Sequence, residues 1–235
     1  MSQTIENLKS FNSKERFFLV GHILGNASFK PCPAFRESIT NALHIQLPES
    51  VFAAMDYHLD WLYASLRLAF NPNLEQRVFE NKDRLIKGQQ EDIDFLFAYE
   101  ADDISHIILL EAKGVGGFTN KQIGSKADRF CEIFAMDGKR WPGVIPHFAF
   151  VSPDRPSGRL QSSAWPMWMR PNNIVPWIEL PMPSGLKKVT RCSQQGKPDK
   201  KGEYWTIHRR PASLTRKTGV YELVGQGRIS RVGSA

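Results

Sequence analysis

Hydrophobic residues change their spacing along the chain near residue 93, and this change separates a helical part from a strand-forming part. Before it the spacing is helical: Ser13 can cap the segment 14–24, and Pro48 opens a longer helix that ends near Phe70. In the longer helix, apolar residues recur at three- and four-residue steps and form a core-facing stripe of Phe52, Met55, Leu59, Leu62 and Leu66.

From Ile93 the pattern becomes two short runs rich in Phe, Ile and Leu, IDFLFAYE and SHIILLEAKG, around the acidic stretch ADDI. This arrangement predicts a β-hairpin with its turn at residues 101–104. Glu100 then pairs with Ser105, and Asp94 lies opposite Glu111. A slip of one residue would turn Asp94 away from Glu111, in which case Asp92 is the alternative.

A second helix and further strands follow the hairpin. Thr119 can cap a helix that runs to about Met136, with Gly138 as its stop. Its buried stripe is Ile123, Ala127, Phe130 and Phe134, and an adjacent stripe holds Gln122, Lys126 and Arg129. Strands are expected at residues 144–152 and within WIELP, so the fold class is α/β.

Composition narrows the choice of partner and compartment. The net charge of +7 and the pI of about 9.4 favour a polyanionic partner. The three cysteines, Cys32, Cys131 and Cys192, are far apart and form no zinc motif, which indicates a reducing compartment. No signal peptide pattern and no run of 18 apolar residues is present. We expect a cytoplasmic protein that does not enter a membrane.

Asp94 and Glu111 bring two negative charges together in the expected hairpin. Directly opposed residues have Cβ atoms roughly 4.5–5.5 Å apart, so these carboxylates repel each other unless a cation lies between them. Mg²⁺ accepts such oxygens, together with water and phosphate oxygens. Lys113 points to the same face as Glu111, and the backbone carbonyl of Ala112 remains available to the ion. The group suits phosphodiester hydrolysis, in which a metal activates water and Lys113 orients it or neutralises developing charge.

EDIDFLF followed by IILLEAK, a small-residue loop and a helix beginning NKQIGSKADRF resembles the PD-(D/E)xK, or restriction-endonuclease-like, nuclease superfamily. The resemblance covers residues 50–152 and implies a mixed central sheet flanked by helices in the order αβββαβ. It also implies that Asp94 and Glu111 bind Mg²⁺, for which Mn²⁺ substitutes, and that Lys113 completes the catalytic site. Gln122 lies where several branches carry a Gln that positions the nucleic acid.

The sequence departs from the family pattern at two points. Ile93 stands where the family has a proline before the aspartate. The extra acid that many members carry on the first core helix falls on Asp60, Glu75 or Glu80. Asp60 lies in the most apolar part of its expected helix, where a carboxylate costs free energy unless it is paired or binds a cation. It is therefore either a structural or solvent-facing residue, which we favour, or a further metal ligand.

Basic residues offer two candidate contacts for nucleic acid. Lys121, Lys126 and Arg129 follow the expected active site on one helix, where they can bind phosphates or form a solvated polar face. Near the C-terminus, basic residues interleave with Tyr204, Trp205 and His208: Lys187, Lys188, Arg191, Lys197, Lys200, Lys201, Arg209 and Arg210. This segment can follow a nucleic-acid backbone, or its aromatic residues can pack on the core, which we favour for Trp205.

We expect one domain over residues 1–224, made of an N-terminal helical extension (1–50), a catalytic core (51–152) and a basic, aromatic elaboration (153–224), with a loosely ordered tail at 225–235. The expected function is a Mg²⁺-dependent DNA endonuclease of prokaryotic defence, mobile elements or repair, and cutting both strands favours a homodimer. The alternative is a module of the same fold that binds nucleic acid or protein without cleavage. RNA or a branched junction remains open as the substrate.

Overall fold

The computed structural model describes residues 2–11, 14–26, 29–71, 78–88, 91–114, 117–156, 160, 162–183 and 186–209. Its elements are α1 (Gln3–Ser10), α2 (Glu15–Phe18), the π-helical turn η1 (Leu19–Ile23), α3 (Pro33–Leu43), β1 (Phe52–His58), α4 (Leu59–Phe70), β2 (Asp92–Ala101), β3 (Ile104–Ala112), α5 (Asn120–Phe134), β4 (Val144–Ser152), the 3₁₀ turns η2 (Met167–Met169) and η3 (Pro171–Asn173), β5 (Trp177–Glu179), β6 (Lys187–Cys192) and β7 (Tyr204–Arg209).

The chain divides into two compact units, Met1–Met182 and Pro183–Ala235. The single domain expected over residues 1–224 stays a prediction. The division into two units follows the hydrogen bonding, because β6 and β7 form a two-stranded sheet of their own, whereas β1 to β5 form a five-stranded sheet in the first unit. Each unit therefore has its own backbone hydrogen-bond ladder.

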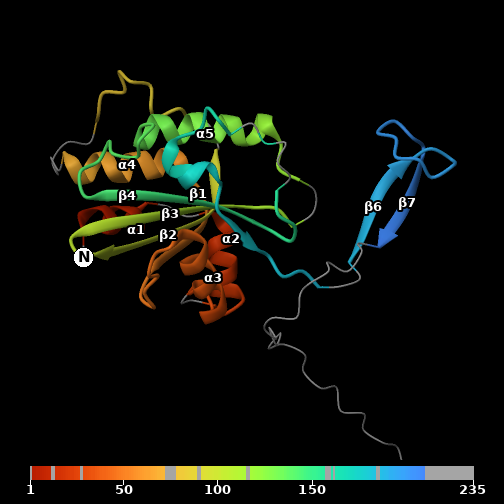
Figure 1. Ribbon diagram of the computed structural model, residues 1–235, viewed down its shortest axis with the longest axis horizontal. Helices are drawn as coiled ribbons and strands as arrows, with labels where there is room; N and C mark the ends of the chain where they lie inside the picture. The colour runs from red at the N-terminus through yellow and green to blue at the C-terminus, as the bar shows by residue number, and fades with distance from the viewer. Residues whose placement is uncertain are drawn as a thin grey trace, which may run out of the picture. The chain divides into compact units, whose positions relative to one another are not determined.

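The five-stranded sheet has the order β1-β2-β3-β4-β5, so neighbours in space follow the order of the chain (Figure 1). β1 to β3 are joined antiparallel, whereas β4 runs parallel to both β3 and β5. A parallel connection needs a long crossover, and α5 supplies it between β3 and β4. The predicted α/β class, with a mixed sheet flanked by helices, is confirmed.

Helices cover both faces of this sheet. Residues of α1, α4 and α5 pack with one face in a core that includes Leu8, Leu66 and Phe130, while Ile39 of α3 packs with the other face (Figure 1). These four side chains are completely buried, so each helix is held by its apolar stripe. No helix in the described ranges combines the length and the hydrophobicity needed to cross a membrane.

The central hairpin has the predicted register. Glu100 pairs with Ser105, and the ladder continues to Phe95 opposite Leu110. Asp102 and Asp103 form the two-residue turn with φ of 51° and 60°, the left-handed conformation that tight hairpins require and that aspartate tolerates better than most residues. The turn and the two apolar runs therefore agree on one alignment.

The predicted helix from Pro48 to Phe70 is wrong in its first half. The chain forms strand β1 over Phe52–His58, and α4 begins only at Leu59. Two features cause the change: β1 finds hydrogen-bond partners along β2, and the His58 side chain accepts the N–H of Asp60 as the N-cap of α4. Pairing with a distant strand thus overrides the local helical spacing.

The remaining elements agree with the sequence pattern within a few residues. α5 begins after Thr119, whose hydroxyl accepts the N–H of Gln122 at 3.3 Å. It ends at Phe134, two residues before the expected Met136. β4 has the predicted bounds, and β5 falls within WIELP. Segment 14–24 forms α2 and η1, while its expected cap, Ser13, lies outside the described residues.

Two histidines meet on the sheet face that packs with α3. Nδ1 of His106 on β3 lies 3.0 Å from Nε2 of His147 on β4, and the Tyr99 ring stacks on His106 with centroids 4.8 Å apart. Burial lowers the pKa of His147 to about 4, and the neighbouring His106 adds to that shift. His147 is therefore neutral in the folded protein at physiological pH.

Acid is expected to destabilise the protein through His147. Its folded-state pKa of about 4 lies below the unfolded value of roughly 6.5, so the unfolded chain takes up the proton first. The free energy of unfolding should fall by up to about 3 kcal/mol between roughly pH 6.5 and 4. Chemical denaturation across this range measures the slope. His147→Gln should flatten it, and His22→Gln, at an exposed position, should not; an unchanged slope in the first variant contradicts this assignment.

Candidate functional site

Asp94 and Glu111 lie at the end of the β2–β3 hairpin away from its turn. The backbone ladder stops at the pair Phe95 and Leu110, one step before these acids. Beyond that pair, a side chain replaces the backbone carbonyl as hydrogen-bond acceptor: Oδ2 of Asp94 accepts the N–H of Ala112 at 2.6 Å. The carboxylate of Asp94 is thus fixed beside the peptide that follows Glu111, as the predicted register requires.

Glu111 is the most buried acid of this group, with only 1% of its surface exposed. Helix α5 supplies two of its partners: Nε2 of Gln122 donates to Oε1 at 3.2 Å, and Nζ of Lys126 donates to Oε2. Residues four apart share one face of a helix, so Gln122 and Lys126 reach the same carboxylate. Nζ of Lys113 lies 3.9 Å from Oε1.

Burial and the neighbouring positive charge have opposite effects on the pKa of Glu111. Burial raises the pKa of its carboxyl above the ordinary value, the Lys126 ammonium opposes this shift, and the negative charge of Asp94 reinforces it. A buried carboxylate without a cation is costly. Lys126 therefore provides the positive charge that the sequence led us to expect from a metal ion alone.

Asp56 and Asp92 extend the acidic group onto β1 and the start of β2. Asp56 lies between the pairs Met55–Phe95 and Tyr57–Ile93, which places it opposite Asp94. It is 7% exposed and adopts a left-handed φ of 49°. Burial raises the pKa of Asp56, with Arg16 opposing the shift and the charge of Asp94 adding to it.

Helix α2 and its N-cap residue bring two cations to these additional acids. Nε of Arg16 lies 3.1 Å from Oδ2 of Asp56, and Nζ of Lys14 donates to Oδ2 of Asp92. Sequence reasoning missed Asp56 because it placed this residue inside a helix. The short apolar run VFAAM, with a break at Asp56 before the capping His58, was the available signal for a strand.

The oxygen donors of Asp94 and Glu111 match the chemistry of Mg²⁺, which uses one or two protein carboxylates and completes its shell with water and phosphate. The two side chains meet this minimum. Within the described ranges no group of three or more His, Cys, Asp and Glu is arranged to hold a metal ion. An ion at Glu111 would also have to displace the ammonium of Lys126.

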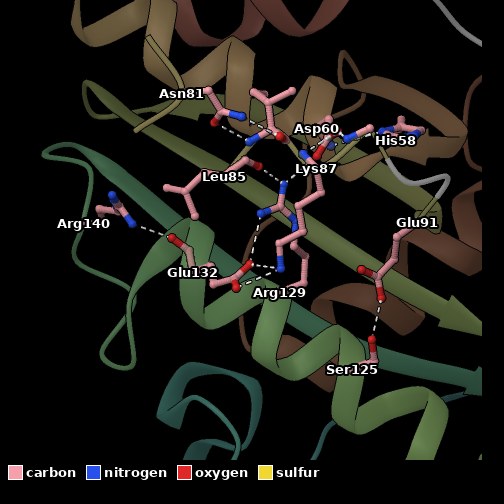
Figure 2. A network of polar contacts seen from close by, with 12 residues as sticks. His58, Asp60, Asn81, Leu85, Lys87, Glu91, Ser125, Arg129, Glu132 and Arg140 are labelled. Atoms are coloured by element: carbon pink, nitrogen blue, oxygen red, sulfur yellow. Dashed lines mark hydrogen bonds and ion pairs between the residues drawn. The ribbon is translucent and has the colours of Figure 1, made fainter. Parts of the chain in front are cut away.

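Asp60, the expected alternative metal ligand, is committed to a different network (Figure 2). Its Oδ1 accepts a hydrogen bond from Nη2 of Arg129 at 2.7 Å, and Oδ2 accepts the N–H groups of Lys87 and Gly88. Arg129 also donates to the carbonyl of Leu85. Asp60 therefore fixes the segment around residues 85–88 to α4 and α5, which agrees with the structural interpretation.

The other expected acids do not reach Asp94 and Glu111. Glu75 lies outside the described residues. Glu80 is exposed and forms an ion pair with Lys82 at 2.7 Å. Both residues line a groove of about 580 Å³, together with Tyr63 of α4. The further described acids near this pair, Asp56 and Asp92, come instead from β1 and β2.

The three basic residues expected to contact nucleic acid have three different environments. Lys121 is exposed on α5. This exposure agrees both with a phosphate contact and with a solvated helix face. Lys126 is buried against Glu111. Arg129 is 2% exposed and also donates to Glu132 at 3.1 Å, so the expected phosphate contact is corrected to a structural ion pair.

Comparisons with known proteins gave no match: no protein-family model matches the sequence, and no curated protein or solved structure matches the chain. The role of Asp94, Glu111 and Lys113 therefore has to be inferred from their geometry and chemistry. Their shared location at one end of the hairpin is the feature that any functional proposal must explain.

Arg129→Ala is expected to lower the free energy of unfolding by about 3–5 kcal/mol, because it leaves Asp60 buried without its cation. Lys121→Ala, at an exposed position of the same helix, should change it by less than about 0.5 kcal/mol. Urea denaturation measures both values. A loss below about 1 kcal/mol for Arg129→Ala would show that the network does not stabilise the fold.

Lys126→Met should destabilise the protein more at neutral pH than at acidic pH. Without the ammonium, the pKa of Glu111 rises further, and the folded state binds a proton that the unfolded state lacks between that pKa and about 4.3. The free energy of unfolding should therefore rise as the pH falls through this window. Denaturation of Lys126→Met and its exposed counterpart Lys121→Met provides the comparison, and equal losses at both pH values would contradict the coupling.

Proposed function

We propose that this chain is a Mg²⁺-dependent nuclease of the restriction-endonuclease-like type that cleaves DNA, with Asp94, Glu111 and Lys113 as its catalytic residues. The observation that carries the proposal is the meeting of an acid from β2 with an acid of β3, and with the lysine that follows β3, at one end of the central hairpin. Asp94 and Lys113 are partly exposed, so this end of the hairpin is open to a substrate.

The element order supports the same proposal. β1, β2 and β3 are followed by α5 and then β4, in one mixed sheet. This order agrees with αβββαβ, except that α4 stands between the first two strands. The insertion does not separate the two strands it joins, since β1 pairs antiparallel with β2 from Phe52 to His58.

Each side chain has a distinct task in the proposed reaction. Asp94 and Glu111, with the carbonyl of Ala112, would hold the divalent cation, which polarises a phosphate and lowers the pKa of a bound water. Lys113 orients the attacking water or neutralises the charge that develops on the phosphate. Gln122 holds the Glu111 carboxylate in place through its amide.

Lys126 has two possible partners in this scheme. Its ammonium neutralises Glu111 in the structure described here. When positive charge from a cation replaces it at Glu111, the ammonium becomes available to a phosphate oxygen, a partner that lysine binds as a point charge. Substrate and cation would then be taken up together.

The Lys126–Glu111 ion pair also favours a second candidate function, a nucleic-acid-binding module that does not cleave. In that case the acids and lysines of the hairpin end stabilise one another, and no ion is needed to neutralise Glu111. Salt-sensitive binding of nucleic acid without hydrolysis in any divalent metal is the behaviour that identifies this module.

Plasmid nicking tests the proposed activity. The protein should nick supercoiled DNA with Mg²⁺ or Mn²⁺ and not with EDTA, and Asp94→Ala or Lys113→Ala should slow nicking at least about 100-fold, as loss of a catalytic group does. Lys139→Ala, at an exposed position outside the candidate site, should retain most of the activity. Nicking that survives Asp94→Ala, or DNA binding without nicking in any metal, would rule out this assignment.

A further inference from the structure

The β6–β7 hairpin is a separately organised element. Its six register pairs run from Lys187 opposite Arg209 to Cys192 opposite Tyr204. The connecting loop folds back on β6: the N–H of Asp199 donates to the carbonyl of Arg191 at 3.0 Å, and the N–H of Ser193 donates to that of Lys197 at 2.8 Å. These bonds hold the loop in one conformation against β6.

The loop requires a glycine at position 202. A Cβ added there would lie 2.1 Å from the carbonyl oxygen of Cys192, well inside van der Waals contact. The carbonyl of Gly202 in turn accepts Nε of Arg191 at 2.6 Å. Close backbone packing in the loop therefore fixes an arginine side chain on β6.

The positive charge in the second unit exceeds the net positive charge of the whole protein, +7. Residues 183–235 contain twelve Lys and Arg against three Asp and Glu, a formal +9, which leaves residues 1–182 at −2. Within the described hairpin, residues 186–209 have seven Lys and Arg against two acids. A polyanion is the partner that complements this distribution.

One face of the hairpin combines this charge with exposed apolar side chains. Side chains alternate along a strand, so Lys187, Val189 and Arg191 share a face, which the register extends to Ile207 and Trp205 on β7. Trp205 and Val189 are each 65% exposed and Ile207 is 49% exposed. Trp205 is therefore not buried within its own unit.

Arg191 and Trp205 are directly opposed across the two strands. An exposed indole offers a flat surface on which a base can stack, and an adjacent guanidinium can bind the phosphate that follows it. Stacking of this kind needs unpaired bases, since the bases of a duplex are already stacked on one another. The pair thus favours a single strand over a double helix.

We infer that the β6–β7 hairpin binds single-stranded nucleic acid, with Trp205 stacking on a base and Lys187 and Arg191 contacting phosphates. The inference rests on the proposed action on nucleic acid and extends it, because it gives the chain a substrate-binding element outside the catalytic hairpin. Binding does not require hydrolysis, so it can be measured whether or not the chain is a nuclease.

Fluorescence anisotropy with a labelled oligothymidylate of about 20 nucleotides tests the inference on the full chain in EDTA, where cleavage by the proposed mechanism cannot occur. Trp205→Ala should weaken binding about tenfold or more, and Trp205→Phe should restore most of the loss, because a base still finds an aromatic face. Lys139→Ala, at an exposed position of the first unit, should bind as tightly as the unchanged protein. Because binding is measured without a divalent metal, this result is separate from that of the nuclease assay.

Lys187 and Lys188 provide a matched pair, since they are adjacent exposed lysines on opposite faces of β6. Lys187→Ala should weaken binding and reduce the dependence of log Kd on log salt by about one, while Lys188→Ala should have a smaller effect. Equal effects of the two lysines, or an unchanged Kd in Trp205→Ala, would overturn the inference. Tighter binding to duplex DNA or to anionic phosphatidylserine vesicles than to the single strand would also overturn it.

Discussion

A carboxylate buried on the central strand of a sheet must have positive charge beside it, and Glu111 imposes this requirement on the whole structure around it. α5 meets it by presenting Lys126 and Gln122 on one face, four residues apart. The sheet contributes by ending the β2–β3 ladder at this point, so that Asp94 bonds to the backbone instead of a strand partner. Helix position, strand ends and charge balance therefore depend on one side chain.

The two acidic networks of the first unit show how differently the same groups can be used. The Asp60 carboxylate accepts hydrogen bonds from Arg129 and from two backbone N–H groups. These contacts compensate its burial and stabilise the fold. Glu111 shares its surroundings with Asp94 and lies next to the partly exposed Lys113. Like charges kept together at an opening are typical of functional sites rather than of structural ion pairs.

The hairpin could be predicted from sequence because its information is local: two apolar runs flank a two-residue acidic turn and favour the alignment that the structure has. β1 could not, because its apolar residues also match a helical repeat and its pairing with β2 is a non-local contact. The ion pairs of Lys14 and Arg16 with the acids of β1 and β2 join segments far apart in the chain. No spacing in the sequence encodes such contacts.

The proposed activity requires that Asp94 and Glu111 exchange the ammonium of Lys126 for a divalent cation. Crystals soaked in Mn²⁺ test it directly through the anomalous signal of the ion. A peak is expected within about 2.2 Å of an oxygen from each carboxylate, with Lys126 moved away from Glu111. Crystals of the same protein that show no peak there, with Lys126 still bound to Glu111, would contradict it.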